Sequence, residues 1–235
     1  MHRITLIVLR NLSILLLVAS FNLGGCGNQS SNADPSSQEI LAQMNQAYAN
    51  CTTYQDTGVV TTTFINSTGR TTIQKPFFTA FVSPDRFRFE YKDSLSSTAP
   101  PYIIWRDGVE VLSWSIINPG IRTEDSIGTA IARATGVSDG SAATIPPLLL
   151  PEIGLRMFYG ETQRIDDAVI DGVNCFRILE NATGDTVWID AKTFLIRRIE
   201  AQHTFSDFST ETVTTYNPVF NGVVTYEMLA FNPPQ

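Results

Sequence analysis

Histidine is almost missing from this sequence of 235 residues. The chain has two histidines, and only His203 lies outside the first ten residues. Zinc sites in proteins take three or four cysteine, histidine or carboxylate ligands, and one histidine cannot build a multi-histidine site. We therefore expect no metal and no cofactor.

Positive charge is also scarce. There are 16 lysine and arginine residues against 23 acidic residues, which gives a net charge of -7, and only three of the basic residues are lysines. An acidic surface repels the phosphate backbone of nucleic acids. We therefore expect no nucleic-acid partner.

Long hydrophobic runs are missing as well. Arg3 and Arg10 precede a mainly apolar run at 14–19. This run is shorter than the stretch of about 20 apolar residues that a membrane-spanning helix needs. Leu23-Gly24-Gly25-Cys26 follows, and it resembles the lipobox of bacterial lipoproteins, in which the cysteine is acylated. The sequence therefore predicts a lipoprotein signal peptide over residues 1–25 and a lipidated, flexible tether over residues 26–37.

Lipidation of Cys26 would decide where the protein is located. Two or more acyl chains give stable membrane anchoring, where one chain gives only marginal binding. Gly27 occupies the second position of the mature chain, which favours the outer over the inner membrane. We expect a membrane-anchored protein of the cell envelope that faces the periplasm. The alternative is an ordinary cleaved signal that contains a cysteine by chance.

Two further cysteines, Cys51 and Cys175, lie in the body of the chain. Exported proteins meet an oxidising compartment, in which disulfide bonds persist. A Cys51–Cys175 disulfide is therefore one expectation. Two buried free thiols are the alternative.

The rest of the chain has the composition of a folded domain, with 43% hydrophobic residues. Ser36 and Glu39 have the spacing of a helix capping box, which predicts a helix at about 36–50. Helical patterns recur at 125–134 and, interrupted by prolines, at 142–153. Alternation of apolar and polar residues predicts eleven strands. These are 54–65, 71–82, 86–92, 102–106, 109–115, 162–169, 173–180, 186–190, 194–204, 208–217 and 223–231.

The short connections between these strands leave no room for crossover helices, so the sheet should be antiparallel. At this point the chain resembles a family. The segments 83–90, 171–176 and 187–198 look like those of the LolA/LolB/LppX-like lipoprotein-sorting superfamily, and in particular its DUF2092-type bacterial lipoproteins. The resemblance implies an α+β fold over 38–235, in which a single domain forms an unclosed antiparallel β-barrel, or half-barrel. An N-terminal helix and a helical lid insertion would lie on its concave side.

The resemblance also implies a function. It implies a non-enzymatic, lipid-anchored envelope protein that binds a hydrophobic ligand, such as acyl chains or a lipoprotein's lipid, in the half-barrel cavity and acts in lipid or lipoprotein localisation. Aromatic residues on the strands and the proline-interrupted lid segment would line that cavity. The candidate lining residues are Phe78, Phe87, Phe89, Tyr91, Trp105, Trp114, Leu148, Leu149 and Leu150.

Two other functions remain open from the sequence. A structural or sensing lipoprotein of the same fold would have a filled core and would act through contacts with an envelope protein partner. A serine hydrolase would use Ser138, which lies in a Gly-x-Ser-x-Gly sequence, with Asp190 and His203. That motif needs a strand before the serine and a helix after it, and here a helix precedes it, so a helix-to-helix loop is the better interpretation and we expect no catalytic residues.

Three acidic residues, Asp166, Asp167 and Asp171, cluster around a predicted hairpin turn. Their spacing fits no calcium-binding loop. Solvated turn residues are the better interpretation. His203, alone near the end of a strand, is expected to be an ordinary surface or core residue.

Overall fold

The computed structural model describes residues 34–96 and 98–234. The predicted signal peptide, Cys26 and most of the predicted tether lie outside these residues. Pro35–Gln235 form one compact unit. No helix in the described part of the chain has the length and the apolar character that a membrane span requires.

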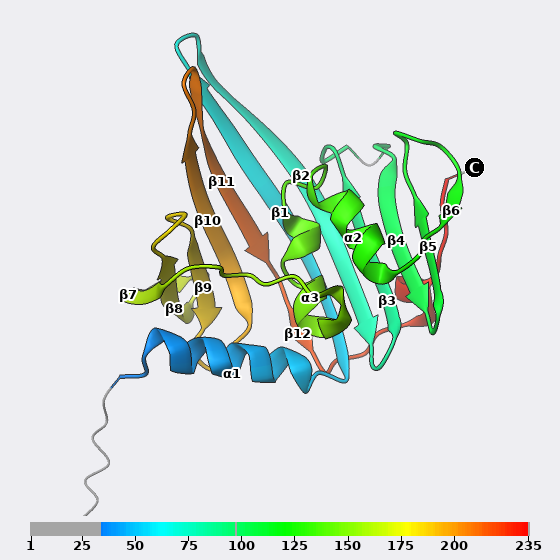
Figure 1. Ribbon diagram of the computed structural model, residues 1–235, viewed down its shortest axis with the longest axis horizontal. Helices are drawn as coiled ribbons and strands as arrows, with labels where there is room; N and C mark the ends of the chain where they lie inside the picture. The colour runs from blue at the N-terminus through cyan, green and yellow to red at the C-terminus, as the bar shows by residue number, and fades with distance from the viewer. Residues whose placement is uncertain (1–33, 97, 235) are drawn as a thin grey trace, which may run out of the picture. The chain divides into compact units, whose positions relative to one another are not determined.

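The unit is built on one antiparallel sheet of twelve strands (Figure 1). The first half of the chain contributes β1 (Thr53–Asn66), β2 (Gly69–Val82), β3 (Arg86–Lys92), β4 (Pro101–Asp107), β5 (Glu110–Trp114) and β6 (Ile121–Thr123). The second half contributes β7 (Thr162–Ile170), β8 (Val173–Glu180), β9 (Thr186–Asp190), β10 (Ile196–Thr204), β11 (Phe208–Tyr216) and β12 (Val219–Phe220). From edge to edge the order is β6-β5-β4-β3-β2-β1-β11-β10-β9-β8-β7, with β12 beside β1. Because β6 and β7 stay at opposite edges, the predicted α+β half-barrel is confirmed.

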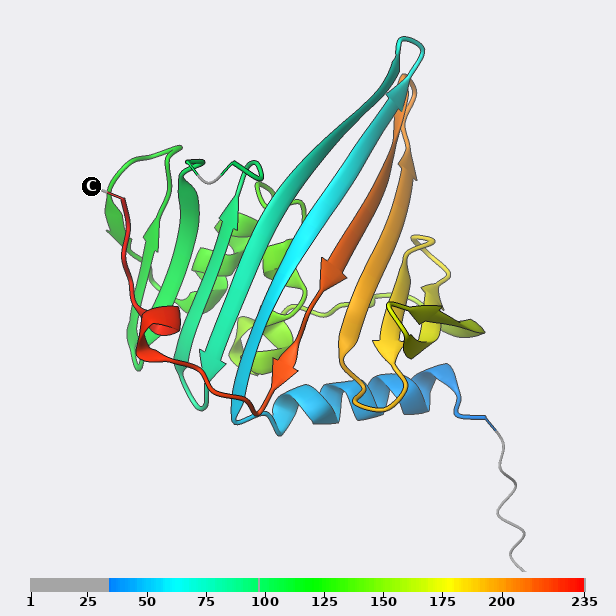
Figure 2. The same ribbon diagram turned by 180° about the vertical axis from the view of Figure 1, so that it is seen from behind.

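Helices cover both faces of this sheet. A lid inserted between β6 and β7 consists of α2 (Ile127–Thr135), η1 (Ser141–Ala143), α3 (Pro146–Leu149) and η2 (Pro151–Ile153). We call the face under this lid the inner face, and Figure 1 shows it toward the viewer. The short helix α4 (Tyr226–Leu229) lies on the opposite, outer face (Figure 2).

The N-terminal helix α1 (Ser37–Ala49) begins at the predicted capping box. The Ser36 hydroxyl accepts a hydrogen bond from the Glu39 amide at 3.3 Å, and the Ser36 amide donates to the Glu39 carboxylate at 2.8 Å. These bonds satisfy amides that have no partner within the first turn. The helix is tied to the edge strand, since the Ser37 hydroxyl donates to the Thr162 carbonyl at 3.0 Å. Ile40, Met44 and Tyr48 form its buried stripe.

Alternation along the strands decides which side chains face inward. On β3, Phe87, Phe89 and Tyr91 point into the core on the inner face, while the charged residues between them point outward. Antiparallel pairing puts Phe89 opposite Thr79 on one side and Ile104 on the other. Residues that face each other across a ladder share a face, so the inward set continues from strand to strand.

The C-terminal end departs from the prediction. The strand expected at 223–231 is wrong, because this segment contains α4 instead. Leu229 is buried against the outer face, where its carbonyl accepts a hydrogen bond from the Trp105 indole at 2.6 Å. Leu229 and Phe231 therefore pack onto the sheet and do not extend it, whereas Val223 and Tyr226 remain exposed.

Candidate ligand-binding site

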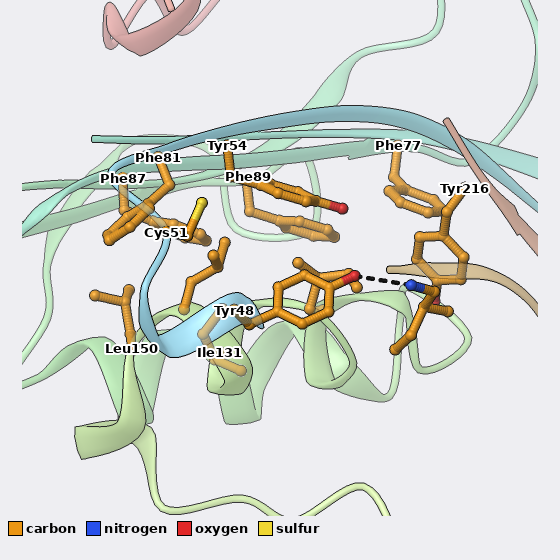
Figure 3. Close-up of a cluster of buried hydrophobic side chains, with 14 of the residues drawn as sticks. Tyr48, Cys51, Tyr54, Phe77, Phe81, Phe87, Phe89, Ile131, Leu150 and Tyr216 are labelled. Carbon is orange, nitrogen blue, oxygen red and sulfur yellow. Dashed lines mark hydrogen bonds between the residues drawn. The ribbon is translucent and has the colours of Figure 1, made fainter. Parts of the chain in front are cut away.

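The interior under the lid is occupied by the protein's own side chains (Figure 3). Phe87 and Phe89 are 0% exposed, and Leu150 from the lid is 1% exposed. The Phe77 and Phe89 rings stack with their centroids 6.3 Å apart, and Tyr216 meets Phe77 edge-on at 5.3 Å. Five of the nine candidate lining residues therefore belong to the core cluster under the lid: Phe87, Phe89, Tyr91, Leu149 and Leu150.

Three other candidates, Phe78, Trp105 and Trp114, lie on the outer face, so the expectation that they line the inner side does not match their positions. Each is the sequence neighbour of a residue that faces inward: Phe77, Ile104 and Ser113, respectively. Trp105 packs against Phe231 of the C-terminal segment, with ring centroids 5.8 Å apart. Leu148 lines an open groove between α1 and the lid.

The two cysteines are free and buried, so the expected Cys51–Cys175 disulfide is not formed. Cys51 belongs to the inner core, whereas Cys175 pairs with Asp190 on the outer face of β8 and β9. A disulfide requires Cα atoms within about 7 Å and Cβ atoms that point toward each other. Burial raises the pKa of each thiol to about 11, so both stay protonated and unreactive at neutral pH.

An open groove runs between α1 and the lid, and its volume is about 510 Å³. This volume falls within the range of about 300–1,000 Å³ typical of ligand pockets. Most of its lining side chains are apolar and come from α1, from α3 and η2, and from the segment that follows them. The lining residues are Leu41, Met44, Asn45, Ala49, Pro147, Leu148, Pro151, Leu155, Arg156, Met157 and Phe158.

The groove's outer wall is the segment 154–161, which connects η2 to β7 and which we call the strap. Leu148, Met157 and Phe158 are half-buried, and Leu155 is 37% exposed. Within the described residues, the backbone amides of 155–158 form no hydrogen bond. Met157 and Phe158 pack against the core cluster, so side-chain packing and not backbone hydrogen bonding holds this part of the chain. The exposed residues Leu155 and Arg156 are the part of the wall that is free to adjust to a ligand.

The far end of the strap is fixed by a buried carboxylate. Glu180 is 3% exposed, and its Oε1 accepts hydrogen bonds from the amides of Tyr159 and Gly160, both at 2.8 Å. Its Oε2 accepts from the Thr183 hydroxyl at 3.0 Å. Burial alone would raise the pKa of Glu180, but these donors outweigh it and hold the pKa below the usual carboxyl value.

The residues of the hydrolase alternative are not assembled. Ser138 is 0% exposed, and its hydroxyl accepts a hydrogen bond from the Ala142 amide at 3.2 Å. Asp190 binds Arg197 at 2.9 Å and lies on the outer face. His203 lines a separate recess of about 390 Å³ among threonine side chains. Ser138 therefore stabilises the loop after α2, as the helix-to-helix interpretation expects.

Of the three clustered aspartates, Asp171 alone lies in the predicted turn, whereas Asp166 and Asp167 lie within β7, where its pairing with β8 is irregular between Ile165 and Ala168. Asp167 forms an ion pair with Arg164 at 2.7 Å, and Asp171 adopts a left-handed conformation (φ 50°) in the turn between β7 and β8. Across residues 34–96 and 98–234, no group of three or more histidine, cysteine or acidic residues is placed to hold a metal ion.

Several groove residues were not among the sequence candidates. Leu41 and Met44 lie on α1 among apolar residues at helical spacing, Ile40, Leu41, Met44 and Tyr48. That spacing is the sequence signal that could have found them. Leu155, Arg156 and Met157 lie in the strap, which has neither helical nor strand periodicity. Their part in the groove follows only from the fold.

No protein-family model matches the sequence, and no curated protein sequence matches it. Solved structures do match. LprF from Mycobacterium bovis is 10% identical with a TM-score of 0.42, over 84% of this chain and 97% of that one. A LolA superfamily protein from Nitrosomonas europaea is 8% identical with a TM-score of 0.33, over 84% and 98%. A putative outer membrane lipoprotein-sorting protein domain from Vibrio parahaemolyticus is 9% identical with a TM-score of 0.35, over 80% and 94%.

Proposed function

We propose that this protein is a non-enzymatic binding protein of the cell envelope that holds an apolar chain, such as an acyl chain, in the groove between α1 and the strap. The observation that supports this proposal is the groove of about 510 Å³ with its largely apolar lining. The ligand would lie outside the filled core and would replace solvent at Leu148, Leu155 and Met157.

The driving force would be the removal of apolar surface from water. Each CH₂ group that becomes fully buried contributes about 0.8 kcal/mol. Affinity should therefore rise with chain length until the groove is full. Ordering the strap would offset part of this gain, because its free amides and side chains lose conformational freedom.

Binding can be tested on residues 27–235, which contain the whole compact unit. A fluorescent fatty acid should bind, and native mass spectrometry after gentle purification should show a retained lipid. Leu155→Glu should weaken binding because it places a charge in the groove. The matched control is Val169→Glu, which changes an apolar residue on β7 that is 63% exposed, and it should leave binding unchanged. A wild-type protein that binds no acyl probe and retains no lipid would refute the proposal.

The membrane anchor is a separate part of the proposal. We propose that Cys26 is acylated and tethers the domain to a membrane of the cell envelope, facing the periplasm, with the outer membrane favoured by Gly27. Cells grown with an alkyne analogue of palmitate should label the wild-type protein and should not label Cys26→Ser. Equal labelling of both proteins, or labelling of neither, would contradict acylation at this position.

A further inference from the structure

One charged side chain lies in the otherwise uncharged groove. Among the described residues that line it, Arg156 alone carries a charge, and Asn45 is the one other polar side chain. Arg156 is exposed and belongs to the strap. Its position beside Leu155 and Met157 places a permanent cation next to the apolar surface.

Arg156 has no partner among the described residues, a property that it shares with Arg122. Nearby arginines are bound to carboxylates: Arg106 pairs with Glu152 of the lid, and Arg164 pairs with Asp167. Arg156 forms no ion pair and no hydrogen bond with any other residue in the described ranges. In a chain with a net charge of -7, an arginine without a carboxylate is available to an anion from outside.

The apolar surface of the groove and the charge of Arg156 together favour one class of ligand. An arginine presents planar donors that match the oxygen atoms of a carboxylate or phosphate. A lone arginine that only spread its methylene groups over the groove would show no preference for head-group charge. The two possibilities therefore differ in a measurable way.

We propose that the groove prefers an amphiphile with an anionic head, whose carboxylate or phosphate pairs with Arg156 while its chain lies along Leu41, Leu148 and Met157. This inference rests on the proposed function, since it names the ligand class of the same groove. The strap supplies both the cation and part of the apolar wall, so head and tail are recognised by one segment.

The test compares ligands that differ in the head group alone. Dodecanoate, dodecyl phosphate and dodecanol are titrated into residues 27–235 by displacement of a fluorescent neutral acyl probe. Wild-type protein should bind the two anions more tightly than the alcohol. Arg156→Gln should weaken the anions by about fivefold, the size expected for an exposed ion pair, and should leave dodecanol unchanged.

Arg122→Gln is the matched control, because Arg122 is an exposed arginine that lines a different recess, beside Glu124. It should change none of the affinities. Circular dichroism and melting temperature establish that both variants are folded. Inorganic phosphate, which has no chain, should not displace the probe.

The outcomes separate this inference from the proposed function. If the three ligands bind wild-type protein equally, or if Arg156→Gln weakens dodecanol as much as the anions, the head-group preference is wrong and the apolar groove stands. Displacement by inorganic phosphate would indicate a simple anion site and would also overturn the inference. If no ligand binds at all, the proposed function itself fails.

Discussion

Asp56 is a carboxylate enclosed in the apolar interior of the half-barrel. It is 2% exposed and lies on β1, opposite Thr79 of β2. Its Oδ2 accepts a hydrogen bond from the Tyr54 hydroxyl at 2.8 Å, while its Oδ1 has no partner in the described residues. Burial raises the pKa of Asp56 to about 6, because water is no longer present to stabilise the charge.

This raised pKa predicts a pH dependence of stability. The folded protein holds the Asp56 proton more tightly than the unfolded chain does. The contribution of Asp56 to stability should therefore be most favourable below the ordinary carboxyl range and should fall as the pH rises through about 6. Asp56→Asn keeps the acceptor for Tyr54 and removes the titration. We expect the variant to gain about 2 kcal/mol over wild type near neutral pH and little near pH 4. Urea unfolding across this range measures both values, and parallel profiles for the two proteins would contradict the assignment.

Glu180 shows the opposite case, because donors surround its charge. Glu180→Ala should leave the amides of Tyr159 and Gly160 without an acceptor and should cost about 1–3 kcal/mol. The lowered pKa means that the contribution of Glu180 is present above the usual carboxyl range and is lost as the pH falls through its folded value. Hydrogen exchange of the two amides should accelerate in the variant. Glu161→Ala is the control, because Glu161 is an exposed neighbouring residue, and hydrogen exchange of the two amides should stay slow in this variant. If their exchange is also unchanged in Glu180→Ala, Glu180 does not anchor the strap.

At the scale of elements, β1 is the central strand, and one residue on it has no room for a side chain. A Cβ at Gly58 would overlap both the Phe77 ring and the carbonyl oxygen of Thr215 on β11. The ring can turn away only by disturbing its contacts with Phe89 and Tyr216. The carbonyl belongs to the neighbouring strand and cannot move without disturbing the β1–β11 ladder.

Gly58→Ala should therefore lower the free energy of unfolding by about 3 kcal/mol, the upper range for overpacking. Gly128→Ala in α2 is the control, because a Cβ there would meet its nearest atom, the Ile153 carbonyl oxygen, at an ordinary 3.6 Å. That variant should be neutral or slightly more stable, since alanine favours a helix over glycine. Chemical denaturation compares the two, and equal stability of both variants would contradict the packing at Gly58.

The sequence predicts the elements of this fold much better than it predicts their faces. Alternation located ten of the twelve strands and the capping box located α1, because both signals are local. The short strands β6 and β12 were missed, since two or three residues are too few to show alternation. On β2, β4 and β5 the residues of both faces are apolar, since the C-terminal segment covers the outer face as the lid covers the inner one. Phe78, Trp105 and Trp114 could not be assigned to a face from the pattern. The groove could not be predicted at all, because it needs the strap, in the middle of the domain, to lie beside the N-terminal helix α1.

At the scale of the whole unit, the sheet consists of two consecutive halves. Strands β1 to β6 come before the lid and β7 to β11 come after it, and the two sets meet where β1 pairs with β11 from Gly58 opposite Tyr216 to Asn66 opposite Phe208. The C-terminal segment adds a second connection through Trp105 and Leu229. The strap is the covalent link between the halves.

A single cut in the strap should therefore leave the fold assembled. With a protease site inserted after Arg156, the two products should elute together at the size of the intact protein and should separate only in denaturant. The long β1–β11 ladder supplies many backbone hydrogen bonds that do not depend on the cut. Separation of the products in buffer would show that the strap itself holds the halves together.

The groove lies across this division, because Leu41 and Leu148 precede the strap cut and Met157 and Phe158 follow it. A bound amphiphile would touch both products at once. The affinity of the two fragments for each other, measured with a split reporter, would then increase as the groove is filled. The protein's own architecture could in this way convert occupancy by a lipid into an optical signal.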